Sequence, residues 1–123
     1  MCKLWEYVSI KMICTLRAPA FCIHLIMKKY FALRLLPPRP GFAHDMTTEE
    51  RSIMQQHVAY WRTLMDKDMV VVFGPVMDPA GVYGLGVVSA EGTEQIEELI
   101  RNDPANGLNR YEYHQMMAVV AEK

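Results

Sequence analysis

His57 and Asp78 are the residues of this chain whose types and surroundings are best suited to proton transfer. A carboxylate that binds an imidazole fixes its tautomer and makes it a better general base. On a predicted helix, His57 falls within about 100° of Tyr60 and Trp61, so its ring faces the core and needs a hydrogen-bond partner. A core histidine that binds a backbone carbonyl would satisfy the same pattern, and the helix alone leaves both interpretations open.

Asp78 begins the sequence Asp-Pro-Ala-Gly, which has the residues preferred in a tight turn. The turn explains Asp78 without any function, and it is also compatible with a carboxylate directed at His57. Gly74 and Pro75 come just before it, and because proline cannot donate to a sheet ladder, they predict an edge, a bulge or a bend. A bend there would open a cavity between helix and sheet, whereas an edge-strand proline that discourages aggregation is the other explanation.

Further candidates lie on the first and last predicted strands and in the loop between the first strand and the first helix. Arg34 and His114 are predicted to line the same cavity and bind an anion together with Tyr60, or else to lie at a subunit interface. The Pro-rich segment 37–46 is long for a connection, and it is either a lid or a solvated loop. No pair of histidines has metal-ligand spacing, and no glycine-rich phosphate loop precedes a helix, so we expect no metal and no cofactor.

The composition excludes several classes of protein. The 123 residues are 51% hydrophobic, which is typical of one folded domain, and 13 basic and 14 acidic residues leave a net charge of -1. Without a basic stripe, nucleic-acid binding is disfavoured, and no apolar run is long enough to cross a membrane. Three cysteines, all before residue 27, have no disulfide or zinc pattern, so a reducing cytoplasmic compartment is expected.

The elements that must position these residues follow from periodicity and turn signals. Residues 1–26 are interpreted as an N-terminal extension that is not integral to the domain, and residues 27–123 as the domain. The alternatives for residues 1–26 are an extra strand or helix that packs on the domain, or a targeting segment. Alternation or β-branched runs predict strands, and helical spacing with a Thr47–Glu50 capping box predicts helices. The strands are expected at 28–36, 69–77, 82–89 and 110–120, and the helices at 48–67 and 93–102.

This β-α-β-β-α-β order predicts an α+β, ferredoxin-like subunit. Two helices cover one face of a four-stranded sheet, yet the last strand is apolar on both of its faces. A second cover is therefore required, and a homodimer that stacks two sheets is the commonest solution. The extension 1–26 could cover part of that face instead.

The ordered set of motifs resembles the YCII-related (YciI-like) proteins. It comprises His57 on its helix, "GPVMD" at 74–78, a glycine at 84 or 86 and "NDP" at 102–104. The resemblance covers residues 27–120 and implies a dimeric α+β barrel in which His57 and Asp78 form the catalytic dyad. That family often has a glycine between the first helix and the second strand, where this chain has Asp68-Met69.

The resemblance implies binding of a small anionic or phenolic molecule beside His57. If the protein is an enzyme, proton transfer by His57 would catalyse a lyase-like elimination or an isomerisation without an organic cofactor. A non-catalytic ligand-binding or accessory module is the competing hypothesis, and a cofactor-free oxygenase ranks below both. Asp78→Asn separates the first two, because binding tolerates an amide and proton transfer does not.

Overall fold

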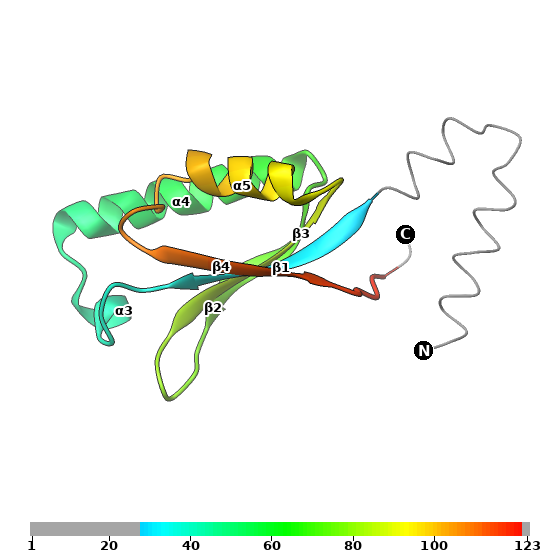
Figure 1. The fold of residues 1–123 in the computed structure, drawn as a ribbon. Coiled ribbons are helices and arrows are strands. Elements are labelled where there is room, and N and C mark those ends of the chain that lie inside the picture. The colour runs from blue at the N-terminus through cyan, green and yellow to red at the C-terminus, as the bar shows by residue number, and fades with distance from the viewer. Residues whose placement is uncertain (1–27, 122–123) are drawn as a thin grey trace, which may run out of the picture.

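The computed structural model describes residues 28–121, which form a four-stranded antiparallel sheet covered on one face by two helices (Figure 1). The sheet order is β2-β3-β1-β4, so the predicted ferredoxin-like βαββαβ topology is confirmed. The predicted extension 1–26 lies outside the described residues. The strands are β1 Lys29–Leu36, β2 Val70–Val76, β3 Tyr83–Ala90 and β4 Arg110–Met116, and the helices are α3 Phe42–Asp45, α4 Thr48–Asp66 and α5 Thr93–Asn102.

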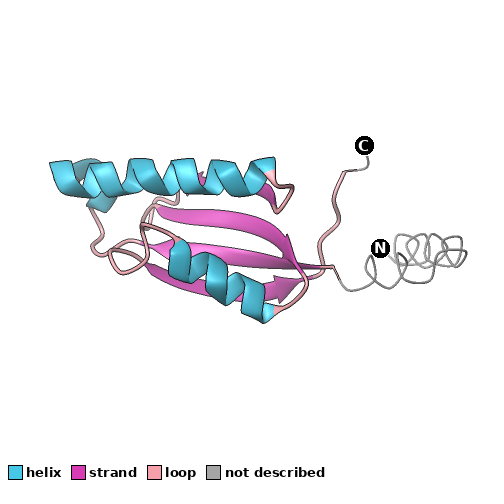
Figure 2. Ribbon diagram, turned by 90° about the horizontal axis from the view of Figure 1, so that it is seen from above, coloured by secondary structure: helices cyan, strands magenta, loops and turns pink. Residues whose placement is uncertain are grey.

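Both long helices lie on the same side of the sheet, as the view from above shows (Figure 2). Alternation along β1 buries Phe31, Leu33 and Leu35 beneath them and turns the intervening residues to the other face. The last strand ends at Met116, before the predicted end at residue 120, because its pairing with β1 ends at Tyr30. Among the described residues, no helix is long and apolar enough to cross a membrane.

The core lies between the sheet and the two helices. α4 supplies Trp61 and Leu64, and α5 supplies Ile96 and Leu99, which are the helical positions that the apolar spacing selects. These four side chains pack on the buried face of β1 and on Val88 of β3 in one cluster. Burial of this apolar area stabilises the fold and fixes the height of α4 above the sheet.

The predicted capping box starts α4. The Thr47 hydroxyl accepts from Glu50 N at 3.1 Å, and the Glu50 carboxylate accepts from Thr47 N at 2.9 Å. Arg39 from the preceding segment donates to the same carboxylate at 2.7 Å and also to Asp45 at 2.9 Å. The segment 37–46, which includes α3, is therefore fastened to the first turn of α4.

The turn between α4 and β2 uses Asp68 in place of a glycine. Asp68 has a φ of 61°, the left-handed conformation that glycine adopts without cost. Its N–H donates to Met65 O, and the N–H of Met69 donates to Leu64 O, which closes the end of the helix. The turn is the one a glycine would make, so the absence of glycine changes its energy and not its shape.

Candidate active site

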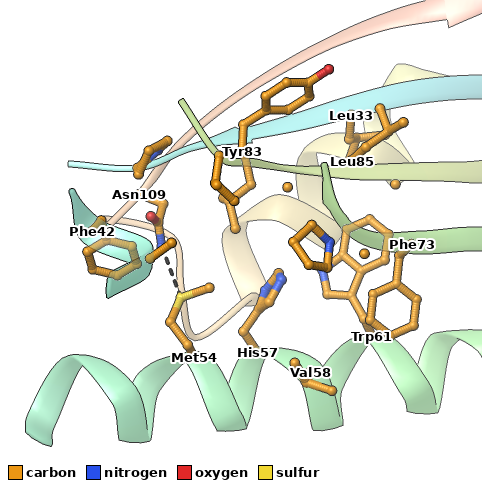
Figure 3. Close-up of a pocket in the computed structure, with 18 of the residues that line it drawn as sticks. Leu33, Phe42, Met54, His57, Val58, Trp61, Phe73, Tyr83, Leu85 and Asn109 are labelled. Carbon is orange, nitrogen blue, oxygen red and sulfur yellow. Dashed lines mark hydrogen bonds between the residues drawn. The ribbon is translucent and has the colours of Figure 1, made fainter. Parts of the chain in front are cut away.

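His57 and Trp61 lie one turn apart on α4, on the face that looks down on the sheet (Figure 3). The Trp61 ring lies against Gly86 of β3, where any Cβ would overlap it, and its centroid is 5.6 Å from that of Phe73 on β2. The indole can therefore lie close to β3 because this position is a glycine. Trp61 in turn spaces α4 from the sheet and leaves room beside His57.

A buried carboxylate, Asp103, binds His57. Asp103 is the C-cap of α5 and is only 4% exposed. Its oxygens lie 2.9 and 3.0 Å from His57 Nδ1, accept from Trp61 Nε1 at 2.8 Å and from Ala105 N at 2.8 Å, and accept from the Tyr111 hydroxyl. Four donors therefore saturate one carboxylate, and among the described residues no enclosed side-chain nitrogen or oxygen lacks a partner.

These contacts determine the protonation of Asp103 and Tyr111. Burial by itself raises the pKa of Asp103, but the hydrogen bonds from His57, Tyr111 and the Ala105 N–H outweigh it and hold that pKa below its usual range. Burial, together with the adjacent charge of Asp103, raises the pKa of Tyr111. Asp103 is thus a carboxylate and Tyr111 a neutral hydroxyl over the ordinary pH range.

The structure corrects the expected pairing of His57 with Asp78. The Asp78 carboxylate accepts from Ala80 N at 2.9 Å inside the β2–β3 turn, and the residue is exposed. That turn extends away from the helix layer (Figure 1). Asp78 therefore binds within its own turn, and the carboxylate that reaches His57 is Asp103.

A cavity of about 250 Å³ opens beside the His57 ring. The described residues that line it include no charged side chain, and most of them are apolar (Figure 3). The wall is formed by Leu33, Leu35, Pro37, Phe42, Ala43, Met46, Met54, His57, Val58, Trp61, Phe73, Gly74, Pro75, Val82, Tyr83, Gly84, Leu85, Gly86, Asn109 and Tyr111. Residues of segment 37–46 are part of this wall, so the long connection closes one side of the cavity.

The other predicted site residues fall in three places. Gly74 and Pro75 line the cavity, where β2 passes beneath α4. Tyr60 does not line it, because its hydroxyl donates to Leu99 O at 2.8 Å and joins the two helices. Arg34 and His114 lie on the opposite face of the sheet, in register with Glu112 and Ala32, respectively.

Asp103 was missed by sequence reasoning, although "NDP" was among the motifs that carried the resemblance. One physical signal was present in the chain. A carboxylate at the C-terminal end of a helix is disfavoured by the helix dipole, and such a residue implies a donor elsewhere. His57, Trp61 and Tyr111 supply the donors, but only the fold brings them to one point.

The arrangement suits acid–base chemistry. His57 lines the cavity, and its Nδ1–H donates to Asp103, so in the neutral imidazole the lone pair is on Nε2. Within residues 28–121, no group of three or more histidine, cysteine, aspartate or glutamate side chains is placed to hold a metal ion. The His57–Asp103 pair is suited to the movement of a proton at Nε2.

Comparisons with known proteins give a family and a fold. The family model of the YCII-related domain matches residues 30–118. Among solved structures, the chain is similar to the 5-chloro-2-hydroxyhydroquinone dehydrochlorinase TftG from Burkholderia phenoliruptrix AC1100, in complex with 2,5-dihydroxybenzoquinone. The TM-score is 0.53 at 20% identity, over 70% of this chain and 92% of that one. At this identity the likeness shows a shared fold. No curated protein sequence matches.

Proposed function

This chain belongs to the YCII-related family, and on that premise we propose that it is an enzyme in which His57 moves a proton on a small phenolic compound. Asp103 acts as the positioning residue for His57. The reaction is an elimination or an isomerisation, which proton transfer alone can drive. The observation that carries the proposal is the pair formed by His57 Nδ1 and the buried Asp103 carboxylate at 2.9 Å, beside an apolar cavity.

The mechanism follows from the tautomer that Asp103 selects. With its proton on Nδ1, His57 presents Nε2 as a base to the ligand, and the carboxylate stabilises the imidazolium that forms. In an elimination, Nε2 takes a proton from the ligand. The electron pair that this proton leaves behind then expels the leaving group from the same molecule as an anion. In an isomerisation, the same imidazolium returns the proton to a different atom.

The substrate class rests on the cavity and on the relative of similar fold. An apolar cavity of about 250 Å³ is suited to a single ring. TftG is a dehydrochlorinase of a chlorinated hydroxyhydroquinone, which supports hydroxylated rings as the compounds to test first. Chlorohydroquinones with and without a further hydroxyl group are the appropriate panel.

Chloride release from this panel tests the proposal. We expect His57→Gln to lower the rate by at least about 100-fold, with the fold unchanged by circular dichroism. His44→Gln is the matched control, because His44 is exposed and does not line the cavity. Turnover by the His57→Gln protein at the rate of the parent protein would overturn the catalytic role.

One observation favours a non-catalytic binding module instead. Asp103 joins α4, β4 and the loop after α5, so the same hydrogen bonds that orient His57 also hold the domain together. A module of this kind would bind the ring compounds with no chloride release and no isomerisation. Binding that persists in His57→Gln, without turnover in either protein, selects this second function.

We also propose that the sheet face opposite α4 and α5 pairs two copies of the chain. A row of side chains crosses all four strands on that face, and it consists of Val72, Val87, Ala32 and His114. Val72 is 53% exposed, and a partner sheet would cover it. Sedimentation should give a dimer, and Val72→Glu should give a monomer, whereas a monomeric parent protein would refute the pairing.

A further inference from the structure

Besides His57, one polar side chain of the cavity wall is available to bind a ligand. Trp61 and Tyr111 also line it, but their donors are bound to Asp103. The hydroxyl of Tyr83 points away from α4 (Figure 3). The remaining polar group of the wall is the amide of Asn109, next to Met54 of α4.

The Asn109 amide is buried but largely unbonded. The residue is 6% exposed, and it precedes β4 with its backbone N–H fixed to Ala105 O at 2.9 Å. Within the described part of the chain, its side-chain Nδ2 donates only to the Met54 sulfur at 3.3 Å, and a thioether is a weak acceptor. A buried amide normally forms stronger hydrogen bonds than this one.

The amide oxygen faces open space. Oδ1 of Asn109 has no protein donor among the described residues, yet no fully enclosed side-chain oxygen there lacks a partner. The oxygen is therefore partly accessible, in a residue that lines the cavity. It is an acceptor that a bound molecule can satisfy.

We infer that Asn109 is the residue that selects the ligand, by accepting a hydrogen bond from a ring hydroxyl, and that the cavity takes neutral hydroxylated rings and not carboxylates. This inference rests on the proposed function, since it describes the ligand of the same site. His57 and Asn109 then contact two different polar groups of one molecule. The ligand class narrows from anionic or phenolic compounds to neutral rings with at least two hydroxyl groups.

The exclusion of carboxylates follows from the wall. No lysine, arginine, aspartate or glutamate within residues 28–121 lines the cavity, and an ionised carboxylate placed among apolar side chains without a cation is strongly disfavoured. A neutral hydroxyl group carries no such penalty once it donates a hydrogen bond to the Asn109 amide oxygen. A ring that lacks the hydroxyl leaves the amide oxygen desolvated and unbonded, which weakens binding.

The test compares hydroquinone, phenol and 4-hydroxybenzoate by NMR titration under anaerobic conditions. In the parent protein, hydroquinone should bind roughly tenfold more tightly than phenol, and 4-hydroxybenzoate most weakly. Asn109→Leu should remove the preference for hydroquinone and keep the affinity for phenol. Asn102→Leu is the matched control, since it makes the same change at an exposed asparagine that does not line the cavity, and it should keep the preference.

A measurement that needs no variant accompanies the titration. The side-chain amide resonances of Asn109 should shift with hydroquinone and not with phenol, so a poorly folded Asn109→Leu protein does not remove the test. Equal affinities for hydroquinone and phenol, or a preference that survives Asn109→Leu, would overturn the inference and leave the proposed function standing. If none of the three compounds perturbs a cavity residue, the proposed function fails and this inference with it.

Discussion

The indole nitrogen of Trp61 lies 2.8 Å from the carboxylate of Asp103, so a residue of the hydrophobic core also holds the charged group of the site. Packing and chemistry thus depend on the same side chain. The position of the indole is set by Gly86, which leaves the ring room above β3.

Gly86→Ala should therefore affect both stability and activity. The added methyl overlaps the Trp61 ring, and displacement of the ring should cost about 1–3 kcal/mol. Chemical denaturation measures the free energy of unfolding. Gly74→Ala is the matched control, since nothing lies within 4 Å of a Cβ built there; comparable losses in the two variants would contradict this account of Gly86.

Asp103→Asn and Asp78→Asn should have opposite outcomes in steady-state kinetics. Replacement of Asp103 removes the charge that selects the His57 tautomer, and kcat should fall by orders of magnitude with a smaller change in KM. Asp78→Asn changes only a turn, because the asparagine side-chain oxygen can still accept from the N–H of Ala80. The kcat of this variant should equal that of the parent protein. A large loss of kcat in Asp78→Asn alone would restore the pairing predicted from sequence.

Acid should weaken the contact between Arg39 and Glu50 that holds segment 37–46 to the first turn of α4. The hydrogen bonds from Arg39 lower the pKa of Glu50 from 4.5 to about 2, so the contribution of this carboxylate to stability is complete above about pH 4.5. It is lost as the pH falls toward 2. Glu50→Gln should flatten the dependence of unfolding free energy on pH in that window, with Glu49→Gln, a change of the adjacent exposed carboxylate, as its matched control. An unchanged acid limb in Glu50→Gln would argue against the Arg39 contact.

Asp68 offers a stability gain without a change in the site. Its φ of 61° costs an aspartate about 1 kcal/mol more than a glycine. Asp68→Gly should raise the midpoint of thermal unfolding, and Asp68→Ala should lower it because alanine tolerates this conformation less well than aspartate. If both variants shift the midpoint in the same direction, the left-handed turn is not what limits stability there.

Most of the fold could be predicted from the sequence because its signals are local. The capping box at Thr47 and the apolar spacing of Ile96 and Leu99 depend on residues within a few positions of one another, and the structure reproduces both. The end of β4 is not local. Met116 is its last residue because the ladder between β1 and β4 ends at the pair Tyr30–Met116, and the residue types alone do not show where that ladder ends.

Of the two residues that form the pair in the site, only His57 was predicted from the sequence. Its orientation follows from the helical period, so one sequence window was enough to place it. Its partner is 46 positions away at Asp103, and the choice between that carboxylate and Asp78 depends on which loop reaches the cavity. Turn chemistry described Asp78 correctly as a turn residue, while the direction of the turn is a property of the sheet twist and the helix layer.

The saturation of Asp103 also has a consequence for motion. Its donors come from α4, from the loop after α5 and from β4, so no one of these segments can separate from the others without breaking several of the bonds together. Local fluctuations of the backbone therefore leave the His57 ring in place. The site loses its geometry only in a cooperative opening that undocks α5 from the sheet, and the free energy of that partial unfolding sets how often the base is misaligned.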